Sequence, residues 1–116
     1  MSRALGAIAE ARAAELLQRK GYRVVDRNWT CRGGEIDLVC VAPDGTLAFV
    51  EVRARANARH GTALETILDG KRRRLVRAAA IYLHVKGKSD AACRFDVVAI
   101  TGDAVEHVED AFRATS

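Results

Sequence analysis

The chain has 116 residues, about half of them apolar, and a net charge of +4, which predicts a single domain over residues 1–116 and permits a polyanionic partner without requiring one. No segment is apolar over a membrane-spanning length, and Glu10 and Glu15 in the N-terminal segment exclude a secretory signal, so a cytoplasmic protein with no membrane contact is expected. The three cysteines lack CxxC spacing, which argues against a disulfide framework or a zinc site, and Cys40 and Cys93 are expected to be buried.

The first predicted element is a helix over residues 3–20, because apolar residues recur there at helical spacing. Its stripe consists of Leu5, Ala9, Ala13, Leu16 and Leu17. Strands are predicted over residues 22–28, 35–42 and 46–53, with a glycine-ending loop over residues 30–34. A polar, basic loop over residues 54–61 follows, and then a helix over residues 69–85. Strands over residues 94–100 and 105–108 complete the pattern.

This order, α-β-β-β-α-β with one more strand possible, indicates an α/β fold with a mixed central sheet and helices packed on it. The turn Pro43-Asp44-Gly45 predicts a hairpin between the second and third strands, since proline fixes φ and glycine accepts the left-handed position. Its register pairs Ala42 with Thr46.

Counting outward from that turn places four pairs on one face of the hairpin. They are Val41 with Leu47, Val39 with Phe49, Asp37 with Glu51, and Glu35 with Arg53. The opposite face is predicted to be apolar throughout. It carries Ile36, Leu38, Cys40, Ala48, Val50 and Val52.

Asp37 and Glu51 would then lie across the ladder with their Cβ atoms about 5 Å apart, where like charges repel. A divalent cation, Mg²⁺ or Mn²⁺, would hold both carboxylates ionised and could activate water against a phosphodiester. Arg53 projects from the same face and could stabilise charge in the transition state. If the register slips, Asp37 faces Arg53 in an ordinary salt bridge and no metal is implied.

Several segments of the chain resemble one known family. The runs Gly34-Glu35-Ile36-Asp37-Leu38-Val39 and Phe49-Val50-Glu51-Val52-Arg53 resemble the D-(x)n-E-x-K signature of the PD-(D/E)xK nuclease superfamily. Together with residues 6–10, Gly21-Tyr22, the region of Lys71 and the run Arg94-Phe95-Asp96-Val97-Val98, they resemble the bacterial YraN-like family over nearly the whole chain.

The resemblance implies a restriction-endonuclease-like three-layer fold similar to that of archaeal Holliday-junction resolvases, which act as dimers, so a homodimer is possible. It implies that Asp37 and Glu51 match metal-ligand positions and that Glu10 matches a first-helix carboxylate that can complete the site. Glu10 could equally be a solvated helix charge. Arg53 matches the position usually held by lysine and departs from the superfamily pattern.

Six cations are candidates for binding nucleic acid beside the acidic pair, because arginine and lysine bind phosphate. They are Arg55, Arg59, Lys71, Arg72, Arg73 and Arg74. A solvated, solubilising face is the alternative. Asp96 could approach the acidic pair or form a cap or ion pair. His60, His84 and His107 show no ligand spacing and are assigned no function.

The leading hypothesis for function is a metal-dependent endonuclease acting on DNA or branched DNA, with Asp37, Glu51 and Arg53 as catalytic residues. A non-catalytic nucleic-acid-binding module that keeps the fold is the rival. A third reading is an interaction protein whose charges form only an ion-pair network.

Overall fold

The computed structural model describes residues 3–57, 59 and 69–114. Two helices and five strands occur in the order α1 (Arg3–Arg19), β1 (Arg23–Cys31), β2 (Gly34–Val41), β3 (Leu47–Arg55), α2 (Asp69–Val85), β4 (Cys93–Thr101) and β5 (Ala104–Phe112). The predicted α/β order is therefore confirmed, including the additional last strand. His60 and part of the predicted loop over residues 54–61 lie outside the described residues.

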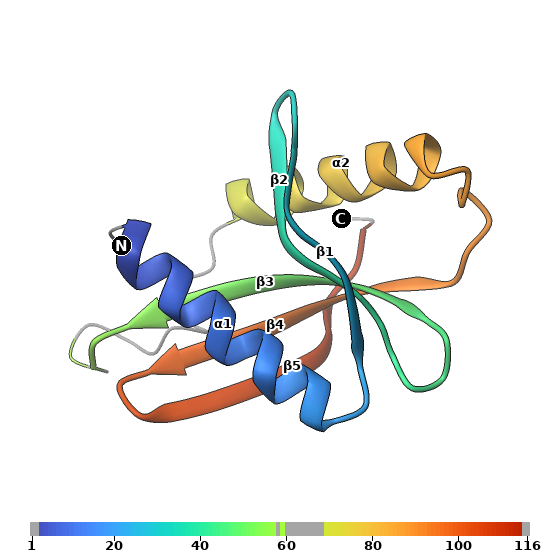
Figure 1. Ribbon diagram of the computed structural model, residues 1–116. Coiled ribbons are helices and arrows are strands. Elements are labelled where there is room, and N and C mark those ends of the chain that lie inside the picture. Colours follow the sequence, from blue (N-terminus) through green and yellow to red (C-terminus); the bar gives the residue numbers. More distant parts are fainter. Residues whose placement is uncertain (1–2, 58, 60–68, 115–116) are drawn as a thin grey trace.

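The strands form one sheet in the order β1-β2-β3-β4-β5. β3 and β4 run parallel, and the other neighbours are antiparallel. A parallel pair needs a long crossover, and α2 belongs to that crossover. Figure 1 shows α1 crossing one side of the sheet, with α2 beside the projecting β1–β2 hairpin. Neither helix in the described part of the chain is long and apolar enough to span a bilayer.

Two apolar clusters, one under each helix, give the protein three layers. On the α1 side, Ala13 and Leu17 pack with Leu38, Cys40 and Val50. On the α2 side, a separate cluster is formed by Leu75, Ala79, Tyr82, Val39, Phe49 and Phe95. Because both faces are covered, β3 and β4 are apolar over most of their length rather than alternating with polar residues.

The β2–β3 hairpin has the predicted register. Val41 pairs with Leu47, and the amide of Ala42 donates to the carbonyl of Thr46 over 2.8 Å. Gly45 has a φ of 90°, as the turn requires. The paired residues extend to Leu38 and Val50, which excludes the slipped register in which Asp37 would face Arg53.

Three predictions fail beyond that ladder. β1 continues to Cys31, so the predicted loop is only a tight turn, and Glu35 pairs with Thr30 of β1 rather than across the hairpin with Arg53. Ile36 packs on the α2 side, although Leu38 packs on the α1 side. Alternation is lost because β2 leaves β3 at this point and follows β1.

Cys93 is exposed and not buried as predicted. It is the first residue of β4, where the strand begins at the end of the sheet. Cys40, the second-last residue of β2, pairs with Val24 of β1 and Ala48 of β3 and is fully buried as expected. An apolar sequence context therefore predicts burial only inside the strand.

Gly34 lets β2 lie directly against α2. A Cβ atom at this position would lie 2.5 Å from the carbonyl oxygen of Arg74 and 3.0 Å from the Cβ of Ala78. We expect Gly34→Ala to lower the free energy of unfolding by about 1–3 kcal/mol, because the helix must move away from the strand. Urea denaturation measures this change.

Gly70→Ala, in the first turn of α2, is the matched control, since a Cβ there meets none of the described residues within 4 Å. It should be neutral or stabilise by up to about 1 kcal/mol through helix propensity. Equal destabilisation by both substitutions would show that close packing at Gly34 is not the cause.

Candidate metal and nucleic-acid site

Asp37 of β2 and Glu51 of β3 lie at the end of the hairpin farthest from its turn. Oδ2 of Asp37 accepts a hydrogen bond from the amide of Val52 over 2.8 Å. Oε1 of Glu51 lies 3.2 Å from Nζ of Lys71, in the first turns of α2. Glu51 is only 7% exposed. Two carboxylates and one ammonium group therefore converge where β2 separates from β3.

The electrostatics of this pair favour a bound cation. Burial raises the pKa of Asp37 well above its usual value, the negative charge of Glu51 raises it further, and that of Glu10 adds to both. The hydrogen bond from the Val52 amide acts in the opposite direction. Asp37 thus lacks enough positive charge nearby to ionise easily, and a cation would correct this.

The possible ligands are few. Within the described ranges, no group of three or more His, Cys, Asp or Glu side chains is arranged to hold a metal. Glu10, half-buried on α1, reaches Asp37 only through its charge. Two carboxylates nevertheless suit Mg²⁺, which commonly takes one or two carboxylates and completes its shell with water and phosphate oxygens.

A small cavity adjoins Glu51. It has a volume of about 10 Å³ and is lined by Glu35, Glu51, Lys71 and Arg74. That volume is near the minimum for a single water molecule, and its walls are polar. The structure therefore offers room for a solvent molecule against Glu51 and Lys71.

The candidate nucleic-acid-binding cations fall in several places. Lys71 is the ion-pair partner of Glu51. The guanidinium of Arg72 lies 5.4 Å from the centre of the Phe112 ring. Arg59 and Arg73 are exposed.

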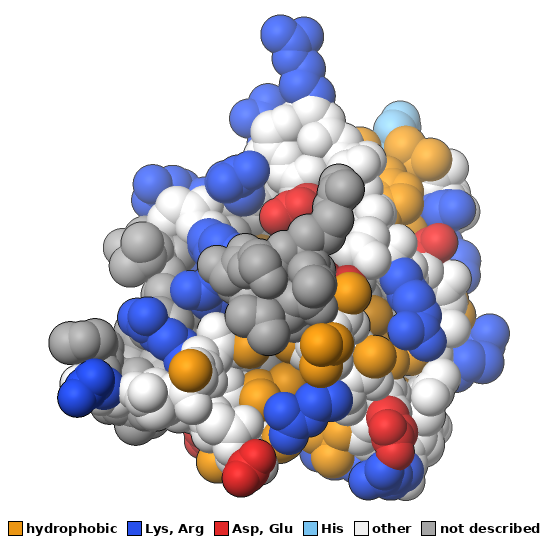
Figure 2. Space-filling view, turned by 60° about the vertical axis from the view of Figure 1, so that its left-hand side comes forward, with side chains coloured by type: hydrophobic (Ala, Val, Ile, Leu, Met, Phe, Trp, Pro, Cys, Tyr) orange, Lys and Arg blue, Asp and Glu red, His pale blue; other side chains and the backbone are white. Residues whose placement is uncertain are grey.

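A separate groove is lined by Arg53 and Arg55 together with Arg12, which the sequence did not single out. Figure 2 shows basic side chains distributed over this end of the molecule, with hydrophobic ones between them.

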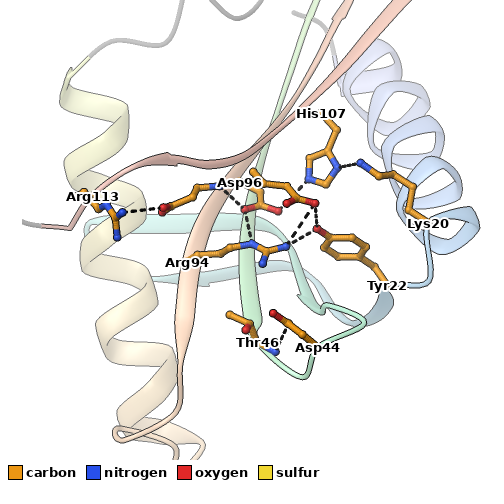
Figure 3. A network of polar contacts seen from close by, with 10 residues as sticks. Lys20, Tyr22, Asp44, Thr46, Arg94, Asp96, His107 and Arg113 are labelled. Carbon is orange, nitrogen blue, oxygen red and sulfur yellow. Dashed lines mark hydrogen bonds and ion pairs between the residues drawn. The ribbon is translucent and has the colours of Figure 1, made fainter.

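A second polar cluster, centred on Asp96 of β4, was not foreseen (Figure 3). The Asp96 carboxylate accepts hydrogen bonds from Nε of Arg94 over 3.0 Å and from the amide of Asp110 over 3.0 Å. Nε2 of His107 lies 2.9 Å from its other oxygen. Asp96 therefore takes the ion-pair role left open from the sequence, and it joins β4 to β5.

The cluster extends to the end of α1. The Arg94 guanidinium donates to the hydroxyl of Tyr22, which donates to Glu109 over 2.9 Å, and Nζ of Lys20 lies 2.6 Å from Nδ1 of His107. Burial opposes ionisation of Asp96, but its hydrogen bonds with His107, the Asp110 amide and Arg94 outweigh burial and lower its pKa. The single signal in the sequence was an aspartate inside an apolar strand.

Fold and site together define a class: a three-layer α/β protein with a mixed sheet, whose hairpin strands bring two carboxylates together, one of them buried and paired with a lysine. The chain belongs to the family described as "Uncharacterised protein family UPF0102", which matches residues 9–100. This membership confirms the resemblance at the level of the family. Placement in the nuclease superfamily stays a prediction.

Relatives match over nearly the whole chain. A UPF0102 protein of Burkholderia ambifaria is 53% identical over 97% of this chain and 79% of its own length. One from Burkholderia vietnamiensis is 51% identical over the same shares. One from Burkholderia pseudomallei is 53% identical over 97% of this chain and 77% of its own length. Their names state a family and no activity.

Proposed function

We propose that this protein is a metal-dependent phosphodiesterase that acts on DNA. The observation that carries the proposal is the contact between the half-buried Asp37 carboxylate and the buried Glu51 carboxylate, with Lys71 directly against Glu51. Two acidic groups forced together are costly unless a cation joins them. The basic side chains around this end of the molecule would supply affinity for a phosphate backbone.

The donor set fits Mg²⁺ or Mn²⁺, held by Asp37 and Glu51 with Glu10 as an outer charge. When bound, such an ion polarises a phosphodiester and lowers the pKa of a coordinated water. Lys71 has a further role: its ammonium group can donate to a non-bridging phosphate oxygen as negative charge develops there. Hydrolysis adds hydroxide to phosphorus, breaks one ester bond and returns a proton to the leaving oxygen.

A binding module without turnover is the second candidate, and one observation favours it. Glu51 already has a cationic partner in Lys71 at 3.2 Å, and Asp37 already has the Val52 amide. An acidic pair satisfied in this way could persist without a metal. Arg53, at a position where the resembled superfamily carries lysine, points in the same direction.

Cleavage assays on labelled junction, flap and linear DNA, with Mn²⁺ or Mg²⁺ and with EDTA, test the proposal. We expect metal-dependent cleavage by the wild type and a loss of more than about 100-fold in Glu51→Gln, since even outer-shell partners of metal ligands are worth about 10- to 100-fold. Denaturing gels of the products give the rates.

Asp44→Asn is the matched control. Asp44 lies in the exposed hairpin turn and caps the amide of Thr46, a bond that asparagine also makes, so cleavage should be unchanged. Salt-sensitive DNA binding by the wild type without cleavage in either metal would establish the binding module instead.

A further inference from the structure

The groove that contains Arg53 is a distinct feature of this end of the protein. It has a volume of about 560 Å³, which lies in the range of small-ligand pockets. Its walls come from three places: α1, the end of β3 and the residues after it, and the β4–β5 turn. Its described lining includes Ile8, Arg12, Arg53, Arg55, Gly102 and Asp103, with isoleucine and alanine side chains between the charged ones.

The backbone holds these walls in place. The amide of Gly102 donates to the carbonyl of Arg55 over 2.8 Å, which ties the β4–β5 turn to the end of β3. A Cβ atom at Gly102 would lie 3.2 Å from the carbonyl oxygen of Ala56. On the opposite wall, Ile8 and Arg12 are one helical turn apart and so share a face of α1.

The lining combines two kinds of chemistry. Three arginines and a single aspartate give it positive charge, while isoleucines and alanines give it an apolar surface. Ile8 is 58% exposed there, so its side chain is accessible to a ligand in the groove. A ligand that matches this lining carries an anionic group next to a flat apolar face.

The groove adjoins the acidic pair along the chain. Arg53 lies two residues after Glu51 in β3, and Ala9 immediately precedes Glu10 in α1. The groove therefore lies close to Asp37 and Glu51, although neither residue is among those that line it. A duplex presents phosphates, sugars and base edges, but its base faces are stacked inside and cannot lie against an apolar wall. An unpaired nucleotide presents phosphate and base together.

We infer that this groove binds one unpaired nucleotide of a nucleic-acid strand, with Arg12, Arg53 and Arg55 at the backbone and Ile8 with the alanines against the base. This inference rests on the proposed function for the identity of the ligand as nucleic acid, and it adds the substrate class: strands with unpaired nucleotides. Among the described residues, the polar side chains that line the groove are the three arginines and Asp103.

Fluorescence anisotropy in EDTA tests this binding without cleavage. Three labelled probes with nearly equal numbers of phosphates are compared: a thymidine strand of about 24 nucleotides, a strand of the same length without bases, and a blunt duplex of about 12 base pairs. We expect the thymidine strand to bind at least about fivefold more tightly than the other two, since base contacts add to the phosphate contacts.

Variants separate the contribution of the phosphate contacts from that of the base contacts. Arg12→Ala should weaken binding of the thymidine strand about three- to tenfold and reduce the slope of log K against log salt by about 0.7. Arg19→Ala removes the same charge from an exposed position on the same helix and should change affinity less than about twofold. Ile8→Ser should abolish the preference over the strand without bases, and thermal melting would verify that it folds.

Equal affinity for the strands with and without bases, or preference for the duplex, would overturn the inference. So would equal effects of Arg12→Ala and Arg19→Ala. These binding results are independent of turnover. If the protein prefers the thymidine strand but shows no metal-dependent cleavage, the groove assignment stands and the phosphodiesterase proposal is refuted. If it cleaves DNA but shows no such preference, the phosphodiesterase proposal stands and the groove assignment is refuted.

Discussion

Replacing Asp96 with alanine is expected to lower the free energy of unfolding by about 3–5 kcal/mol, the usual cost of removing one partner from a buried ionic cluster. Asp96 is 0% exposed. Its removal leaves the Arg94 guanidinium, the His107 ring and the Asp110 amide without their common acceptor. Because total stabilities are about 5–15 kcal/mol, this single change could unfold much of the protein at physiological temperature. Urea denaturation followed by circular dichroism measures the loss.

Asp90→Ala, at an exposed position between α2 and β4, is the control and should stay within about 0.5 kcal/mol of the wild type in free energy of unfolding.

The pH dependence of stability is a second readout of the role of Asp96. Because the folded pKa of Asp96 is lowered, its contribution is complete above the unfolded pKa of about 4 and is lost as pH falls through the folded value. Asp96→Asn should flatten the acid side of the stability curve. An unchanged curve would contradict the assignment of Asp96 as the ionised centre.

The parts of the fold that the sequence predicted depend on local chemistry. The turn Pro43-Asp44-Gly45 specifies its own backbone angles, so the hairpin register followed by counting. Helical spacing gave both helices, because a stripe of apolar residues must face the sheet. The same counting failed at Ile36, because β2 leaves β3 after Leu38 and follows β1. Where a strand changes partner is decided by the whole sheet and not by alternation.

In the candidate site too, contacts within one hairpin could be predicted from the sequence, whereas contacts between distant elements could not. Asp37 and Glu51 come from one hairpin, and their proximity could be deduced from its register. Lys71 reaches Glu51 through the packing of α2, 20 residues away along the chain. Tyr22 and Arg94, 72 residues apart, meet only after β4 and α1 have both packed. Contacts of this kind leave no periodic pattern, since each residue satisfies its local element without them.

Asp37→Asn is expected to have opposite effects on activity and stability. Metal-dependent cleavage should fall by more than about 100-fold, because a carboxylate ligand is lost. In EDTA at neutral pH, the free energy of unfolding should rise by about 1–2 kcal/mol, because a neutral amide avoids the cost of burying an ionisable carboxyl group beside Glu51. Asparagine can still accept the Val52 amide, so the backbone contact is kept. Cleavage gels and urea denaturation of the same preparations give the two readouts.

The pH dependence of that stabilisation identifies its cause. The folded pKa of Asp37 is raised by burial and by Glu51, so the folded state holds this proton more tightly than the unfolded state. Wild-type stability from this group therefore falls as pH rises from the unfolded pKa of about 4 through the folded pKa, and the advantage of asparagine should vanish below about pH 4. Glu35→Gln, an exposed change two residues earlier in β2, should alter stability by less than about 0.5 kcal/mol. If Asp37→Asn instead destabilises the protein at neutral pH, Asp37 is held by cations already present, and the carboxylates then form an ion-pair network with no need for a metal.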